Sequence, residues 1–118
     1  MQRVLELYQT RNGKEPFRTW YESLAHDHRA FDAITRRLSR LRAGNFANSK
    51  SIGRKGSGPL VLELLINVGP GYRIYCARVS PATVLLLGGG TKRRQQNDIE
   101  MAKQRMTDYK ARCHGKTA

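Results

Sequence analysis

Two short links join three strand-like segments in the second half of the chain, and they constrain the fold more than any other feature. The segments are Leu60–Ile66, Tyr72–Val79 and Thr83–Leu87, and they are rich in branched and aromatic residues. The links read NVGPG and SPA, and connections this short join neighbouring strands that run in opposite directions. This half of the chain therefore predicts a three-stranded antiparallel meander.

The remaining segments predict one more strand and three helices. Val4–Tyr8 is a short apolar run, and Pro16 is well placed to open a helix because the first helical N–H needs no partner. Apolar residues recur at helical spacing in three segments: residues 16–25, 29–43 and 95–112. The first two helices are expected to form an antiparallel hairpin. The order β-α-α-β-β-β-α then predicts a single α+β domain over residues 1–118.

Two polar, glycine-rich segments are expected to lie outside the main elements. Residues 45–59, NFANSKSIGRKGSGP, predict a loop or an irregular strand edge, and GGGTKRRQQ, residues 88–96, is expected to end the last strand. Residues from about 113 onward are expected to fray. The helices, including the C-terminal one, are expected to pack on one side of the antiparallel sheet, which leaves the other face open.

The positive charge is concentrated in the middle of the chain. The net charge is +13, and residues 33–97 hold twelve of the 22 Lys and Arg residues but a single acid, Glu63. The two flanks together are close to neutral, with ten basic and eight acidic residues. A field of this kind attracts polyanions, so we expect a nucleic acid as partner.

Arg73 stands between tyrosines in the middle predicted strand. Arginine is rarely buried unless it is paired. Side chains alternate between the two faces of a strand, so Arg73 and Tyr75 face outward if Tyr72 and Ile74 face the core. We therefore expect Arg73 and Tyr75 to lie on the open face of the sheet.

The sequence lacks the motifs of several classes of enzyme. A metal nuclease needs clustered carboxylates, and the middle of the chain contains only Glu63. His26, His28 and His114 all stand far from the predicted sheet in sequence. We therefore expect neither a metal ion nor a cofactor.

The two cysteines and the termini indicate the compartment. Cys76 and Cys113 have no metal-binding spacing and are expected to be reduced thiols. The N-terminus lacks the apolar core of a signal peptide, and no apolar run is long enough to cross a bilayer. We expect a cytoplasmic protein without membrane contact.

Four segments of the chain, taken in sequence order, resemble the segments of one protein family. They read YQTRNGKEPFRTWYESL (Tyr8–Leu24), GNFANSKSIG (Gly44–Gly53), GPGYRIY (Gly69–Tyr75) and LLLGGGTKRRQQNDIEMA (Leu85–Ala102). Together they resemble the HigB-like addiction module killer proteins of the RelE/ParE toxin superfamily. The resemblance implies a RelE-like fold and a toxin of a type II toxin–antitoxin pair, with a cognate antitoxin as partner. It also implies metal-independent cleavage of mRNA on the ribosome, which blocks translation.

The resemblance also implies roles for individual residues. Arg73 matches a phosphate-contacting arginine, Lys50 matches the basic residue of the GN-F loop, and Lys92 belongs to a K-x-x-Q motif. These three are the candidate catalytic residues, for charge stabilisation or proton transfer. Tyr75 is expected to stack on a base, and the other basic residues to hold the RNA backbone. The whole predicted RNA-binding set is Arg54, Lys55, Tyr75, Arg93, Arg94 and Gln95.

Three features depart from the family pattern. Leu65 stands where the E-L-R-I strand of the family has an arginine, and Thr91 stands where its G-G-D-K-S-x-Q segment has an acid. In the same segment, Arg93 and Arg94 follow Lys92. Two alternatives therefore stay open. One is a ParE-like poison of DNA gyrase, and the other is a basic RNA-binding module without catalytic activity.

Overall fold

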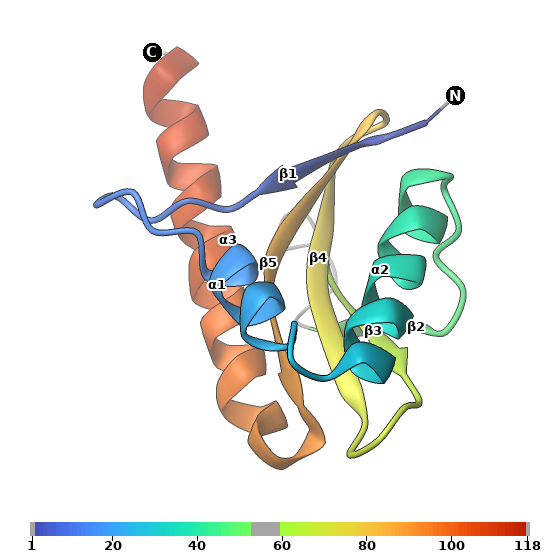
Figure 1. Ribbon diagram of the computed structural model, residues 1–118. Helices are drawn as coiled ribbons and strands as arrows, with labels where there is room; N and C mark the ends of the chain where they lie inside the picture. The colour runs from blue at the N-terminus through green and yellow to red at the C-terminus, as the bar shows by residue number, and fades with distance from the viewer. Residues whose placement is uncertain (1, 53–59, 118) are drawn as a thin grey trace.

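The computed structural model describes residues 2–52 and 60–117 (Figure 1). Along the chain, the elements are β1 (Val4–Leu7), α1 (Pro16–Ser23), α2 (His28–Arg42), β2 (Ser49–Ile52), β3 (Val61–Ile66), β4 (Tyr72–Ser80), β5 (Thr83–Thr91), the 3₁₀ helix η1 (Lys92–Arg94) and α3 (Gln95–Thr117). The predicted α+β class is confirmed, and α1 begins at Pro16 as predicted.

The described strands form a five-stranded sheet in the order β1-β5-β4-β3-β2. β3, β4 and β5 make the predicted antiparallel meander, in which Ile74 lies between Leu64 and Gly89. β2 adds to β3 in antiparallel orientation. β1 adds to β5 in parallel orientation, with Leu5 opposite Val84. A parallel pair needs a long crossover, and the segment from α1 to β4 supplies it.

Helices cover both faces of the sheet, so the expectation that they all lie on one side is wrong (Figure 1). Phe17 of α1 and Leu41 of α2 pack in a core on one face, whereas Met106 of α3 packs in a second core on the other. The cause lies in the strands. Leu85 and Leu86 are consecutive in β5 and point to opposite faces, so both faces must be removed from water.

The run Gly88–Gly90 does not end the last strand as expected, because β5 continues through it to Thr91. A β-carbon on Gly89 would collide with the ring of Trp20 in α1. One on Gly90 would collide with the carboxylate of Asp98 in α3. The glycines therefore let helices on opposite faces approach the same strand closely.

Of the two alternatives for residues 45–59, the strand edge is confirmed for Ser49–Ile52, which forms the edge strand β2 with Ile52 buried in the core on the α3 side. One boundary differs from the prediction. α3 continues to Thr117, past the end predicted near Arg112. Fraying of the residues after 113 stays a prediction.

The glycine run generates a stability prediction. Gly89→Ala should lower the free energy of unfolding by about 1–3 kcal/mol, because the new methyl group overpacks the contact between β5 and Trp20. Urea denaturation of the single variants and of the double variant with Trp20→Leu completes a double-mutant cycle. The cost of Gly89→Ala should shrink in the Trp20→Leu background, where the smaller side chain leaves room. An equal cost in both backgrounds would show that Trp20 is not the obstacle.

Burial of Cys76 generates a second prediction, on thiol reactivity. Cys76 is buried and Cys113 is exposed, and burial raises the pKa of the Cys76 thiol to about 12. Because the thiolate is the nucleophile, a thiol reagent at about pH 8 should modify Cys113 quickly and Cys76 only after unfolding. The Cys113→Ser variant should then show no fast reaction. Two thiols that react at one rate in the native wild type would contradict the buried position of Cys76.

Candidate nucleic-acid interface

A buried carboxylate, Glu63 of β3, lies on the α3 side of the sheet close to the start of α3. Its oxygens accept hydrogen bonds from the Tyr75 hydroxyl at 3.0 Å and from the Gln95 side-chain amide at 3.0 and 3.2 Å. The Nε atom of Arg73 lies 3.5 Å from the same carboxylate. We call Glu63, Arg73, Tyr75 and Gln95 the Glu63 cluster. It joins β3, β4 and the first residue of α3.

The strand register places Lys50 of β2 beside this cluster. Lys50 lies opposite Glu63, and Glu63 lies opposite Tyr75, so the three side chains stand in a row on one face of the sheet. Lys50 is exposed, and it forms no ion pair with another described residue. Its ammonium group is therefore available to a ligand, next to a carboxylate whose oxygens are already engaged.

Arg73 is mostly buried but not fully satisfied. Its side chain is 11% exposed, and its Nη1 atom has no hydrogen-bond partner within the described part of the chain. An unsatisfied buried donor costs free energy, so this nitrogen is a candidate contact for an anion. The Nη1 atom lies beside Gly71, whose carbonyl accepts a hydrogen bond from the backbone N–H of Lys92 at 3.1 Å. Two of the predicted catalytic residues, Arg73 and Lys92, are thus brought to the same turn.

Tyr75 cannot serve as the predicted base-stacking platform, because it is only 1% exposed and lies in the core on the α3 side. Tyr75 and Ile74 do lie on opposite faces of β4, as predicted. However, α3 covers the face of Tyr75, which was expected to be open. Burial, and then the hydrogen bond to Glu63, raise the pKa of the Tyr75 phenol. The phenol therefore stays protonated at neutral pH and acts as a donor to Glu63.

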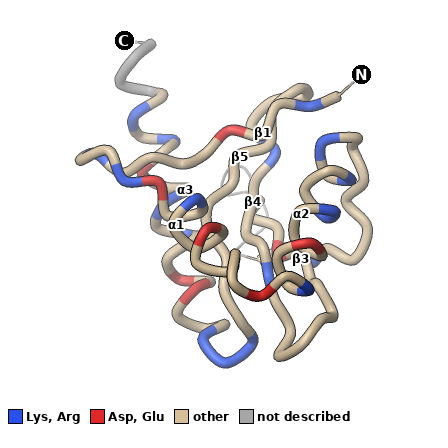
Figure 2. The backbone as a smooth tube through the Cα atoms, in the orientation of Figure 1, with Lys and Arg blue, Asp and Glu red and all other residues tan. Residues whose placement is uncertain are grey.

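The basic run at the turn into α3 is divided between two places. Lys92, Arg93 and Arg94 form η1, which is a blue stretch of the backbone before α3 in Figure 2. All three residues are exposed. Whereas Lys92 lies at the Gly71 turn, Arg94 lines a groove between α1 and α3 along the edge of β5. In that groove, burial raises the pKa of the Asp98 carboxyl, and the charge of Arg94 opposes this rise.

The structure thus brings together four predicted residues, Lys50, Arg73, Tyr75 and Gln95, around one acid. The predicted RNA contacts Arg54 and Lys55 lie outside the described residues. The sequence prediction gave no role to Glu63, which organises the site. Two signals pointed to it: it is the single acid of the basic middle of the chain, and it lies in a strand that is otherwise apolar.

No group of three or more His, Cys, Asp or Glu side chains that could hold a metal ion occurs among the described residues. None of the helices described here is both long enough and apolar enough to cross a bilayer.

The arrangement is suited to contact with phosphate groups. Lys50 and Lys92 offer exposed ammonium groups, and the buried guanidinium of Arg73 adds a positive charge beneath the surface. Hydrogen bonds between such cations and phosphate oxygens are among the strong ones in proteins. Both oxygens of Glu63 are engaged, and Tyr75 is a donor, so the cluster serves mainly to position Arg73.

Comparison with known proteins identified one relative. A protein of Haemophilus influenzae, described as uncharacterized, is 38% identical to this chain over 87 residues. The match covers 74% of this chain and 82% of the relative. No family model and no solved structure matches the chain.

The hydrogen bond between Tyr75 and Glu63 generates a stability prediction. Tyr75→Phe should lower the free energy of unfolding by about 1.5–3 kcal/mol, because a buried carboxylate loses a donor. Tyr72→Phe is the matched control: Tyr72 is buried in the same strand, and its hydroxyl has no hydrogen-bond partner among the described residues. Urea denaturation measures both variants. Equal losses in the two would mean that the hydrogen bond to Glu63 contributes nothing.

Proposed function

We propose that this chain, which belongs to the same family as the uncharacterized Haemophilus influenzae protein, is the toxin of a type II toxin–antitoxin pair. Its proposed activity is metal-independent cleavage of mRNA on the ribosome, which stops translation. The observation that carries the proposal is the arrangement of cations around Glu63. The exposed Lys50 and the mostly buried Arg73 lie on the same side of the sheet, where Lys50 would donate hydrogen bonds to a phosphodiester and the positive charge of Arg73 would act on it.

The proposed reaction joins the ribose 2′-oxygen to the neighbouring phosphorus and breaks the bond from phosphorus to the 5′-oxygen. Arg73 would stabilise the negative charge that builds up on the phosphate oxygens. Proton transfer, from the 2′-hydroxyl and to the departing 5′-oxygen, would fall to Lys50 and Lys92, the exposed titratable groups of the site.

We also infer a RelE-like fold in which α1 and α2 form the N-terminal helical hairpin. The two helices follow each other in the chain and cover the same face of the sheet. The ring of Tyr21 in α1 stacks on Phe31 in α2 with 4.4 Å between the ring centroids. This contact between consecutive helices supports the hairpin.

The proposed partner in the cytoplasm is a cognate antitoxin. Exposed cations at Lys50, Lys92 and Arg93 would attract an acidic protein surface as well as RNA. An antitoxin that pairs with these residues would block RNA binding while it is bound.

A second candidate function is RNA binding without cleavage. The ion pair with Glu63 engages part of the Arg73 guanidinium, and Leu65 lies opposite Arg73 at the position where the resembling family has an arginine. Both features lower the positive charge available to a transition state. The two candidates agree on the ligand and differ in whether the RNA is cut.

Induced expression in a bacterial host tests the proposal, with pulse labelling of protein and DNA synthesis. The wild type should stop protein synthesis first, and Lys50→Ala should reduce RNA cleavage by about 10²-fold because a cation that contacts the phosphate is lost. Lys110→Ala is the matched control, since Lys110 is an exposed lysine of α3 that lies outside the Glu63 cluster. Arg73→Ala should also restore protein synthesis. Its circular dichroism needs to match the wild type, because it leaves Glu63 without its ion pair.

Three outcomes would count against the proposal. Arrest and cleavage that persist in Lys50→Ala and Arg73→Ala would remove both residues from the reaction. RNA binding with no cleavage would select the binding module, and an early stop of DNA synthesis would select a poison of DNA gyrase.

A further inference from the structure

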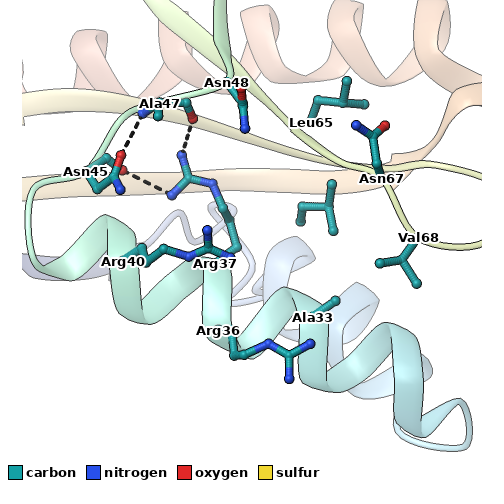
Figure 3. A pocket seen from close by; sticks show the side chains of 11 residues that line it. Ala33, Arg36, Arg37, Arg40, Asn45, Ala47, Asn48, Leu65, Asn67 and Val68 are labelled. Atoms are coloured by element: carbon teal, nitrogen blue, oxygen red, sulfur yellow. Dashed lines mark hydrogen bonds between the residues drawn. The ribbon is translucent and has the colours of Figure 1, made fainter.

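A basic pocket lies on the other side of the sheet edge, between α2, the segment that leads into β2, and the turn between β3 and β4. It has a volume of about 260 Å³. Figure 3 shows Arg36, Arg37 and Arg40 along the helix, with Asn48 and Asn67 across from them. Neither the family resemblance nor the Glu63 cluster assigns this pocket a role.

Arg37 gives the pocket a rigid wall. It is 5% exposed, and its guanidinium donates hydrogen bonds to the carbonyl oxygens of Asn45 at 3.0 Å and Ala47 at 2.7 Å (Figure 3). The backbone N–H of Ala47 in turn donates to the side-chain oxygen of Asn45. Asn48 follows with a φ of 58°, a left-handed conformation that asparagine tolerates better than most residues. The segment before β2 is thus held in one shape by a buried arginine.

The charges of the pocket are not balanced within it. Three of its eleven lining residues are arginines, and none is an acid. The charges of Arg37 and Arg40 are close enough to interact, because burial and then the charge of Arg40 lower the pKa of Arg37. Arg36 and Arg40 are exposed and stand one turn apart on the helix, so both can turn to one ligand. An anion in the pocket would relieve their mutual repulsion.

We propose that this pocket binds one nucleotide of a single-stranded RNA, with its phosphate on Arg36 and Arg40. The rest of the lining suits a base better than it suits a peptide carboxylate. Ile66 and Val68 offer apolar surface on the α2 side, and Asn48 and Asn67 offer amides that can both donate and accept hydrogen bonds at a base edge.

Leu65 of β3 connects the pocket with the Glu63 cluster on the other face of the sheet. Leu65 lines the pocket and lies opposite Arg73 in the strand register. Its backbone N–H donates to the carbonyl oxygen of Asn48 at 3.2 Å, and Lys50 follows two residues later. An RNA strand that leaves the pocket past Leu65 would therefore reach Lys50 and Arg73. The choice of RNA as ligand rests on the proposed function.

The test is the binding of a labelled single-stranded RNA oligonucleotide, followed by fluorescence anisotropy from about 50 to about 200 mM salt. The double variant Arg36→Ala/Arg40→Ala should bind about tenfold more weakly or worse. Its salt slope should fall by about 0.7, since the two arginines hold one phosphate and each lost phosphate contact on a single strand contributes about that much. The matched control is Arg29→Ala/Arg42→Ala, which removes the same charge from exposed positions of α2 that do not line the pocket. The control should lose less than about threefold in affinity.

Equal losses of RNA affinity in the two double variants would contradict the proposed nucleotide site and indicate only a general effect of charge on binding. Displacement of the RNA by polyglutamate at equal charge concentration would also overturn it, because the site would then recognise acidic peptide as well as RNA. Asn67→Ala, which keeps every charge, should weaken binding without changing the salt slope, and unchanged binding would remove the base contact. Circular dichroism confirms that each variant is folded.

The outcome is separable from that of the proposed function. Binding that depends on Arg36 and Arg40, combined with cleavage that is unaffected by Lys50→Ala, would uphold the pocket and reject the catalytic site. Cleavage that depends on Lys50, with equal binding losses in the two double variants, would do the reverse.

Discussion

The carboxylate of Glu63 is the group on which the arrangement of the candidate site depends. A buried charge is costly unless it is paired and hydrogen-bonded, and Glu63 meets this requirement with donors from two other elements. Tyr75 and Arg73 come from β4, and Gln95 is the first residue of α3. The hydrogen bond from Gln95 fixes where the helix begins against the sheet. The same carboxylate orients Arg73, so one side chain couples the packing of α3 to the position of the main candidate for contact with phosphate.

Because helices cover both faces of the sheet, the candidate site lies at the edge of the sheet and not in the middle of an open face. α3 buries Tyr75 and leaves β2, at the end of the sheet, as the element that carries an exposed lysine beside the cluster. β2 is a short edge strand with three exposed residues and one buried residue, Ile52. Edge strands often carry lysine, which discourages pairing with another chain. Here the same placement also presents Lys50 to solvent next to the Glu63 cluster and within a few residues of the pocket on α2.

The features that could be predicted from the sequence were those set by residues close to one another in the chain. The strands of the meander, the helix start at Pro16 and the alternation of Tyr72 and Arg73 all followed from short-range patterns. The glycine run was misread for the same reason. Three consecutive glycines indicate a break when only neighbours in sequence are considered. In the structure, they are strand residues that pair with β4, and the absence of side chains lets Trp20 and Asp98 approach them from opposite sides.

The sequence by itself determined the fold class, the meander and the basic middle of the chain, because periodicity, short links and charge are local or additive properties. Only the tertiary structure decided that α3 covers the second face, that Glu63 gathers Arg73 and Gln95, and that the arginines of α2 meet the turn between β3 and β4. These contacts join residues far apart in the chain. They depend on which apolar faces bury each other most completely, and hydrophobic burial is non-directional, so no local pattern specifies the partner.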